Sequence, residues 1–197
     1  AMVTIPEGES LDSLLPVVRQ SPQTYAMLAL LGDKAFLLND GKTAFVMYGV
    51  EGRSWIAMGD PVGPREEWPE LAWRFRDMAD RVNGWTVFYE VGSESLPLYI
   101  DLGLTVFGLG EEAVVPLDTF SLEGSGRKDL RHGKNRLEKE GCRFEILSVD
   151  QVPAVLPRLR EISDAWLGEK KASEKGFSLG RFTEPYMRRF PAAVVHR

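Results

Sequence analysis

The chain has 197 residues, of which 44% are hydrophobic and 27% are charged, and its formal net charge is −5. This composition is typical of a globular protein with one full domain and part of a second. The longest uncharged apolar run, residues 25–32, is much shorter than the roughly 20 residues of a membrane-spanning helix. A single cysteine, Cys142, excludes an internal disulfide and a cysteine-rich zinc site, and favours a reducing, cytosolic compartment.

The first part of the chain predicts two helices followed by an antiparallel meander. Ser21 followed by Pro22 is typical of a helix start, and Gly32 is typical of a helix end. Three β-rich segments separated by turn residues come next, and this pattern predicts a meander of strands. The predicted elements are helices over residues 10–20 and 22–32, and strands over residues 35–40, 43–50 and 54–60.

A predicted amphipathic helix follows the loop GDPVGP, residues 59–64. Its apolar residues recur at helical spacing until Gly84. The order of helices and strands predicts an α/β (α+β) fold with an antiparallel start. The elements expected after this helix are a strand over 85–92, a short helix over 94–104 and strands within 105–117. The side chains expected to pack this helix into the core are Trp68, Leu71, Phe75 and Val82.

The polar, glycine-bearing stretch 118–126 predicts a connection between two domains. We expect a first domain over residues 1–122, a basic connecting helix over 123–141 and the start of a second domain over 142–197. The elements expected in the second domain are a strand from Cys142, helices over 152–167 and 184–190, and a strand from Ala192.

The stretch from Arg127 to Arg143 carries seven Lys or Arg and three Asp or Glu, a local net charge of +4 in an acidic chain. Cations at the N-terminal end of a helix oppose its dipole, so helix stability does not explain them. The helix has no aromatic residue for base stacking, which favours contact with the backbone of a folded RNA or with an anionic lipid surface. The expected polyanion contacts are Arg127, Lys128, Arg131, His132, Lys134, Asn135, Arg136 and Lys139.

A solvated connector is the alternative interpretation of this helix, since Glu138 and Glu140 balance part of its charge. Leu130, Gly133 and Leu137 form a narrow apolar seam on the other side of the helix, and this seam is expected to pack.

Little catalytic chemistry is visible in the sequence. The chain has two histidines, His132 and His196, and no metal-binding or Walker motif, so a nucleophilic triad is not indicated. The loop GDPVGP joins a strand to a helix N-terminus, where an anion could bind, but its glycines and prolines could equally shape a tight turn. The acidic residues of this region, Asp60, Glu66 and Glu67, argue against a pyrophosphate. We keep Asp60 as a candidate substrate contact and expect no metal and no cofactor.

Four segments, AFLLND, GRSWIAMGDPVGP, RKDLRHGKNRLEKEG and EKGFSLGRF, together resemble the cytosolic C-terminal domain of the phosphatidylglycerol lysyltransferases, also called multiple peptide resistance factors. The resemblance implies two tandem acyltransferase-like (GNAT) domains joined by the basic helix, the first complete and the second truncated. It also implies transfer of a lysyl or alanyl group from aminoacyl-tRNA to phosphatidylglycerol, which confers resistance to cationic antimicrobial peptides. The basic helix would hold the tRNA.

The partners that the resemblance implies are aminoacyl-tRNA, phosphatidylglycerol, the inner-leaflet membrane surface and the protein's own N-terminal transmembrane region. It places the protein on the cytoplasmic face of the bacterial cell membrane. The family's acid and arginine motif has no counterpart before Arg197, so we expect the catalytic residues beyond it and no transferase activity in this chain alone. Ala1 and Met2 are typical of a cloning remnant, and we expect a fragment at both ends.

Of the family's active region the chain holds the segment GFSLGRFTEPYMRR, in which Arg181 and Tyr186 are candidate substrate contacts. A tyrosine on an amphipathic helix is also typical of a core position. Two other functions remain open: a GNAT-type transferase that uses acyl-CoA or acts on peptide, and a non-catalytic module that binds RNA or a membrane.

Overall fold

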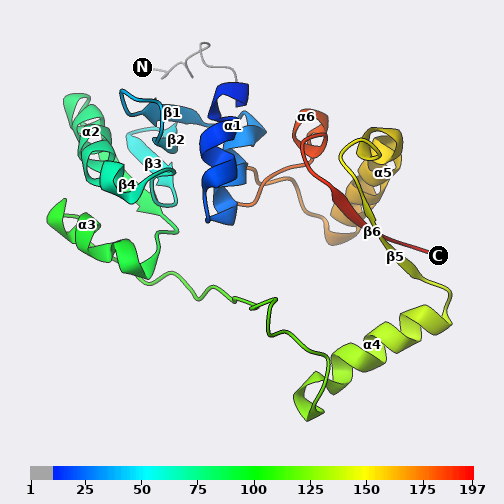
Figure 1. Ribbon diagram of the computed structural model, residues 1–197. Helices are drawn as coiled ribbons and strands as arrows, with labels where there is room; N and C mark the ends of the chain where they lie inside the picture. The colour runs from blue at the N-terminus through cyan, green and yellow to red at the C-terminus, as the bar shows by residue number, and fades with distance from the viewer. Residues whose placement is uncertain (1–10) are drawn as a thin grey trace. The chain divides into compact units, whose positions relative to one another are not determined.

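The computed structural model describes residues 11–197 (Figure 1). The chain forms two compact units. Unit 1 consists of the chain up to Phe107 together with Asp164–Thr183, and unit 2 consists of Gly108–Ser163 and Glu184–Arg197. The mixed α/β class expected from the sequence is confirmed. The expected domain limits at residues 122 and 141 stay a prediction, because the limits of compact units do not have to coincide with the limits of domains.

Unit 1 is built on a four-stranded sheet in the order β1-β2-β3-β4. The first three strands pair antiparallel, as the predicted meander requires, and β4 pairs parallel with β3. A parallel pair needs a crossover connection, and the helix α2 supplies it between β3 and β4 (Figure 1). These elements span Ala35–Leu38 (β1), Phe45–Glu51 (β2), Ser54–Met58 (β3), Trp68–Arg81 (α2) and Trp85–Tyr89 (β4).

One face of this sheet packs against α2 through aromatic rings. Phe75 is fully buried, and its ring centroid lies 5.1 Å from that of Tyr48 and 5.4 Å from that of Phe88. The ring of Trp55 stacks on that of Tyr48 at 5.5 Å. Aromatic pairs at these separations add to the free energy gained from burying their area. The centre of unit 1 is therefore this cluster between α2 and the sheet.

The core positions expected on α2 are confirmed for Trp68, Leu71 and Phe75, which are buried. The expectation for Val82 is wrong, since 60% of this residue is exposed. The helix ends at Arg81 and Val82 takes the cap position, where the backbone leaves the helical path. The regular spacing that would bring position 82 to the core therefore stops one residue too early.

The opposite face of the sheet is covered by the first helices of the chain (Figure 1). The helix α1 spans Leu11–Gln20 within the expected range, and its Leu14 and Val18 are buried. The expected helix over 22–32 is shorter and is a 3₁₀ helix, η1, at Thr24–Leu31. It ends where predicted, because Gly32 takes a left-handed conformation with φ of +74°.

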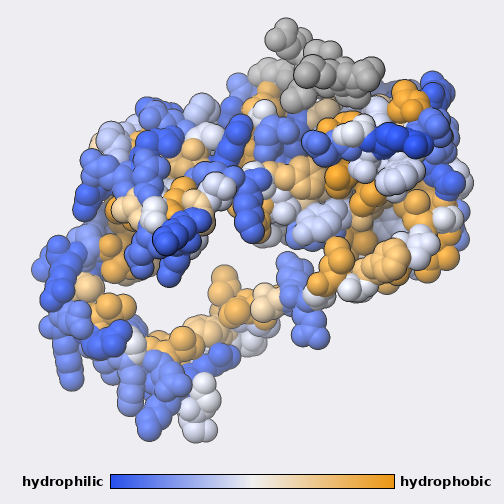
Figure 2. Space-filling view, turned by 180° about the vertical axis from the view of Figure 1, so that it is seen from behind, coloured by the Kyte–Doolittle hydropathy of each residue, from blue (hydrophilic) through white to orange (hydrophobic). Residues whose placement is uncertain are grey.

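After β4, a 3₁₀ turn η3 (Ser93–Ser95) and the short helix α3 (Leu96–Asp101) occupy the expected helical region. The strands expected within 105–117 are absent from the structure, where this stretch is irregular and exposed. A strand needs a neighbour for its backbone hydrogen bonds, and no described strand pairs with this stretch. Its large side chains stay exposed, as for Phe107 and Leu109, and Figure 2 shows hydrophobic residues exposed at the surface among hydrophilic ones.

Unit 2 contains a two-stranded antiparallel sheet in which Phe144 lies opposite Val195. The buried residues of unit 2 are Leu147, Val152 and Leu156, at the end of β5 and the start of α5. The predicted helix from Val152 runs three residues longer than expected, and the predicted helix from Glu184 is shorter. The elements are α4 at Lys128–Lys139, β5 at Arg143–Leu147, α5 at Val152–Lys170, α6 at Glu184–Met187 and β6 at Ala192–His196; α5 continues into unit 1.

Candidate functional site

The loop GDPVGP leads from β3 to α2, and two of its glycines are required by the backbone. Gly59 has φ of +70°, and a Cβ there would lie 2.5 Å from the ring of Tyr25. Gly63 has φ of +124°, and a Cβ there would lie 2.5 Å from the carbonyl oxygen of Thr43. Only glycine fits these two conformations and approaches. The backbone conformation and close packing of the loop therefore account for Gly59 and Gly63, and a bound ligand is not needed to explain them.

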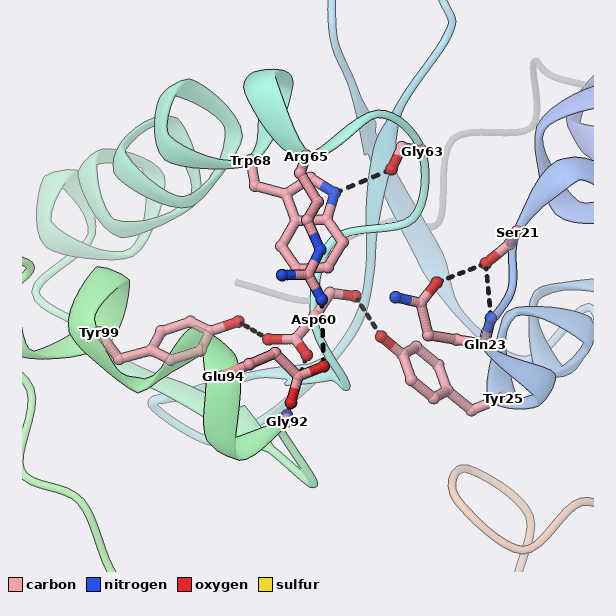
Figure 3. Close-up of polar contacts among 10 residues, drawn as sticks. All are labelled: Ser21, Gln23, Tyr25, Asp60, Gly63, Arg65, Trp68, Gly92, Glu94 and Tyr99. Carbon is pink, nitrogen blue, oxygen red and sulfur yellow. Dashed lines mark hydrogen bonds and ion pairs between the residues drawn. The ribbon is translucent and has the colours of Figure 1, made fainter. Parts of the chain in front are cut away.

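Asp60 of this loop is buried in a polar cluster of unit 1 (Figure 3). Its Oδ1 accepts a hydrogen bond of 2.6 Å from the hydroxyl of Tyr99, and its Oδ2 accepts one of 2.9 Å from the backbone N–H of Gly92. The hydroxyl of Tyr25 donates to the backbone carbonyl of Asp60 at 3.3 Å. Asp60 therefore joins the loop to α3 through its side chain and to η1 through its backbone.

The electrostatics of this cluster follow from its burial. Loss of water raises the pKa of the Asp60 carboxyl, and the hydrogen bonds from Tyr99 and Gly92 oppose this rise. Burial also raises the pKa of Tyr99 and of Tyr25, and the nearby charge of Asp60 raises both further. The two tyrosines are therefore neutral hydrogen-bond donors, and the donors that the fold supplies to Asp60 favour its ionised form against the larger effect of burial.

Ser95 lies beside this carboxylate, is 6% exposed and makes no hydrogen bond of normal geometry through its hydroxyl in the described structure. Its hydroxyl nevertheless helps to hold the ionised form and lowers the pKa of Asp60. This contact falls short of normal hydrogen-bond geometry and is therefore weaker than those from Tyr99 and Gly92. Both oxygens of Asp60 already accept protein donors, and with 4% of the residue exposed it has little surface left for a substrate.

Arg65, in the 3₁₀ turn η2 (Arg65–Glu67) before α2, compensates part of the negative charge near the loop. Its guanidinium lies 3.1 Å from Glu94 and sits over the ring of Trp68, 5.2 Å from the ring centroid (Figure 3). The indole N–H of Trp68 donates to the carbonyl of Gly63 at 3.0 Å. The ion pair is exposed, and such pairs contribute about 0–1 kcal/mol, so it orients side chains more than it stabilises the fold.

The predicted polyanion face lies on α4 in unit 2. No residue of α4 is buried, and Leu130 and Leu137 are 50% and 42% exposed. The expectation that their apolar seam packs is therefore wrong within unit 2. The reason is that α4 makes its only substantial packing contact in the described structure with the short 3₁₀ turn η4 (Ser125–Arg127) that leads into it.

The eight predicted contact residues on and before α4 differ in what their side chains already bind. Arg131 donates to the carbonyls of Leu122 and Gly124, the latter at 2.6 Å, and so caps the preceding loop. Lys134 and Arg136 form exposed pairs with the glutamates four residues later, at 2.7 and 4.0 Å, and Arg127 stacks on the ring of Phe120. In the described part of the chain, no hydrogen bond or ion pair engages the remaining four, which are Lys128, His132, Asn135 and Lys139.

One face of α4 carries a shallow, open hollow. Its lining residues are Asp129, His132, Gly133 and Arg136, one turn apart along the helix. The absence of a side chain at Gly133 contributes to this hollow, since a Cβ there would meet nothing within 4 Å. The hollow therefore places an imidazole and a guanidinium beside open space on the basic helix.

The two other predicted substrate contacts lie in different units. Arg181 is an exposed residue of unit 1, and Tyr186 is a partly buried residue of α6 in unit 2. The ring of Tyr186 packs on Phe190 with centroids 4.8 Å apart, and burial raises its pKa. Within unit 2, Tyr186 thus has the packing of a core side chain.

The sequence does not predict the hydrogen bonds of Tyr25 and Tyr99 to Asp60. Both tyrosines lie in apolar helical segments, where an aromatic residue is typical of a core position. Among the described residues, no three His, Cys, Asp or Glu side chains gather in a way that could hold a metal ion. None of the described helices combines the length and hydrophobicity needed to cross a bilayer.

Comparison with known proteins extends these observations. Residues 16–197 match the family model described as "Phosphatidylglycerol lysyltransferase, C-terminal". A phosphatidylglycerol lysyltransferase of Bacillus subtilis is 40% identical over 168 residues, and one of Staphylococcus aureus is 35% identical over 164 residues. These alignments cover 85% and 83% of this chain, which spans 19% of the length of either relative.

Two solved structures share the fold. The C-terminal domain of a putative lysylphosphatidylglycerol synthetase from Agrobacterium fabrum has a TM-score of 0.89 at 37% identity, covering 95% of this chain and 59% of that one. L-PGS from Bacillus licheniformis has a TM-score of 0.86 at 36% identity, covering 93% and 58%. The match over nearly all the described residues shows that this chain belongs to the phosphatidylglycerol lysyltransferase C-terminal family.

Proposed function

We propose that this chain is part of an enzyme that transfers a lysyl or alanyl group from aminoacyl-tRNA to phosphatidylglycerol and so confers resistance to cationic antimicrobial peptides. Family membership over residues 16–197 carries this proposal. Its place of action would be the cytoplasmic face of the bacterial membrane, next to an N-terminal transmembrane region of the same protein. An aminoacyl ester is already activated, so the reaction needs mainly proximity, a base for the lipid hydroxyl and stabilisation of an oxyanion.

For the architecture, we propose two tandem acyltransferase-like (GNAT) domains, over 1–122 and from 142, joined by the basic helix. The meander followed by a parallel strand across α2 in unit 1 supports the first of these domains. The second would begin with β5. The roles assigned to this chain are binding roles: α4 for tRNA, and Arg181 and Tyr186 for the lipid or aminoacyl group, while Asp60 supports its own loop.

The exposure of α4 supports its role in tRNA binding. Its cations have no buried partner, and those that form ion pairs do so at the surface, where such pairs contribute little and are easily exchanged for phosphate contacts. Contacts to phosphates release counterions and make affinity fall with salt. The single acidic residue of the first turn, Asp129, leaves a net positive charge along the whole helix.

The experiment measures tRNA binding by fluorescence anisotropy at several salt concentrations. Lys128→Gln combined with Lys139→Gln removes two cations that have no protein partner in the described structure, and so leaves the fold intact. We expect the slope of log K against log salt to lose about 1.5, because each phosphate contact contributes about 0.7–0.9. The loss of affinity should be similar for different tRNA species, since phosphate contacts carry no sequence information.

Arg81→Gln combined with Arg158→Gln is the matched control, because it removes the same charge from exposed positions on two other helices, α2 and α5. Its slope should equal that of the wild type. An unchanged slope in the α4 double variant would make α4 a solvated connector. Binding of acetyl-CoA without binding of tRNA would favour the acyl-CoA transferase instead.

A further inference from the structure

Lys34, at the start of β1, is the most unusual buried residue of unit 1. Its side chain is 0% exposed, although lysine is almost never fully buried without a partner. The Nζ lies 2.7 Å from Oδ1 of Asp33 and 3.4 Å from the carbonyl oxygen of Leu28. Burial lowers the pKa of Lys34, and the hydrogen bond that its ammonium donates to Asp33 opposes this. The fold therefore keeps a costly ammonium group in its interior and compensates it with one carboxylate.

This ion pair holds a segment that lies far away in the sequence. The second carboxylate oxygen of Asp33 accepts the backbone N–H of Phe177 at 3.0 Å, across 144 positions. The ammonium of Lys34 faces the ring of the same residue at 5.4 Å from its centroid, within the range of a cation–π contact. Both partners of the buried pair thus contact Phe177.

Phe177 lies on the sheet face opposite α2. A Cβ at Gly49 would be 3.4 Å from its ring, and the ring of Tyr89 is 6.5 Å away between centroids. Gly49 follows Tyr48, which points into the α2 cluster, and alternate residues of a strand point to opposite faces. The backbone of Phe177 has φ of +49°, a left-handed conformation that is unfavourable for a non-glycine residue. The contacts with Asp33 and Lys34 compensate this strain.

The same segment carries Arg181 at its exposed end. Gly180, one residue before it, has φ of +74° and packs near Leu28 and Leu31 of η1. Arg181 has no ion-pair partner among the described residues. It lies close enough to Lys34 for its positive charge to lower the pKa of that residue. Leu179 beside it is 69% exposed. An unpaired cation next to exposed apolar surface suits an amphiphile with an anionic group.

We propose that Asp33, Lys34 and Phe177 are positioning residues, which hold the segment 176–181 so that Arg181 contacts the phosphate of an anionic lipid headgroup. The inference rests on the proposed function for the choice of lipid. Arg181 makes the contact, and the buried pair acts through it. Bidentate, charge-assisted contacts between a guanidinium and a phosphate depend on orientation, so loosening the anchor weakens them without removing the cation.

A double-mutant cycle on lipid binding tests this directly. The ligand is dihexanoylphosphatidylglycerol below its micelle concentration, measured by calorimetry on the 197-residue chain. Arg181→Gln is expected to weaken binding about tenfold, the loss of one charge-assisted contact. Lys34→Met is expected to weaken it nearly as much. In the Arg181→Gln background, Lys34→Met should add little, because two residues that act through one contact are not additive.

If Lys34→Met does not fold, Phe177→Leu replaces it in the same cycle. Arg188→Gln, at an exposed arginine directly after α6, is the charge-matched control and should bind like the wild type. Additive effects of Lys34→Met and Arg181→Gln would show a general loss of structure and overturn the inference. So would a wild-type chain that does not bind the lipid, or an Arg181→Gln variant that lowers the salt slope of tRNA binding. These results leave the α4 experiment unaffected, so the two proposals fail separately.

Discussion

Replacing Tyr99 by phenylalanine removes one hydroxyl from the Asp60 cluster and leaves the aromatic ring in place. The lost hydrogen bond is 2.6 Å long, buried, and directed to an ionised carboxylate. Hydrogen bonds to charged groups contribute about 1.5–3 kcal/mol, and breaking this one leaves Oδ1 of Asp60 without its donor. We expect Tyr99→Phe to lower the free energy of unfolding at pH 7 by about 2–3 kcal/mol.

The loss should depend on pH in a defined direction. Burial raises the pKa of Asp60 in the folded chain, so between its unfolded value, about 3.9, and the raised folded value the folded state binds more protons than the unfolded state. Stability from this group therefore falls as pH rises through that window and stays low above it. Tyr99→Phe removes a hydrogen bond that lowers the pKa of Asp60, so it raises this pKa further. The free energy of unfolding of the variant should therefore decrease more than that of the wild type as pH rises. Near pH 4, at the lower end of that window, a larger share of the Asp60 carboxyl is protonated than at pH 7, and we expect a smaller loss of about 1 kcal/mol.

Urea denaturation followed by tryptophan fluorescence measures both values. All five tryptophans lie in unit 1, so the signal reports the unit that holds the cluster. Tyr89→Phe is the matched control, because its hydroxyl has no hydrogen-bond partner among the described residues, and its effect should stay within about 0.5 kcal/mol. The reasoning is refuted if Tyr99→Phe is as stable as the wild type at pH 7, or if it loses the same free energy at pH 7 and pH 4.

Two further predictions concern the packing of unit 1. Phe75→Ala should lower the free energy of unfolding in urea by about 3–5 kcal/mol, because the ring is fully buried at the centre of the aromatic cluster. Trp73→Ala, on an exposed part of α2, should lower it by less than about 1 kcal/mol. Equal losses for the two variants would contradict the described core. Gly63→Ala should lower the free energy of unfolding by more than about 2 kcal/mol in the same assay, since its Cβ would collide with the carbonyl of Thr43. Gly52 also has positive φ but has open space around it, so Gly52→Ala should lower it by about 1 kcal/mol. A smaller loss at Gly63 than at Gly52 would contradict the steric argument.

The elements predicted well from the sequence are those whose signal is local. The meander follows from short β-rich segments and turn residues, and α2 from apolar residues at helical spacing. The basic helix was predicted from its charge run and is present as α4. Val82 shows the limit of this reasoning, because periodicity does not say where a helix ends to within one residue.

The features that the sequence did not predict depend on distant partners. The stretch 105–117 has the apolar pattern of strands, but a strand forms only where another supplies its hydrogen bonds. The helical segment before Gly32 gave no sign that it would adopt 3₁₀ geometry. The anchor between Asp33 and Phe177 spans 144 positions, and Asp33-Lys34 alone reads as an ordinary surface pair.

That long span has a consequence for the order in which the protein folds. A chain emerges from the ribosome N-terminus first, so all four strands of the unit 1 sheet exist before Phe177 is made. Closing a loop of this size costs roughly 4 kcal/mol, and each doubling of its length would add only about 0.6 kcal/mol. Until closure, the amine of Lys34 lacks its contact with the ring of Phe177, and we expect it to be more open to water. We therefore expect the returning segment to complete a sheet that is already formed, and the intervening residues 108–163 to tolerate changes in length during evolution.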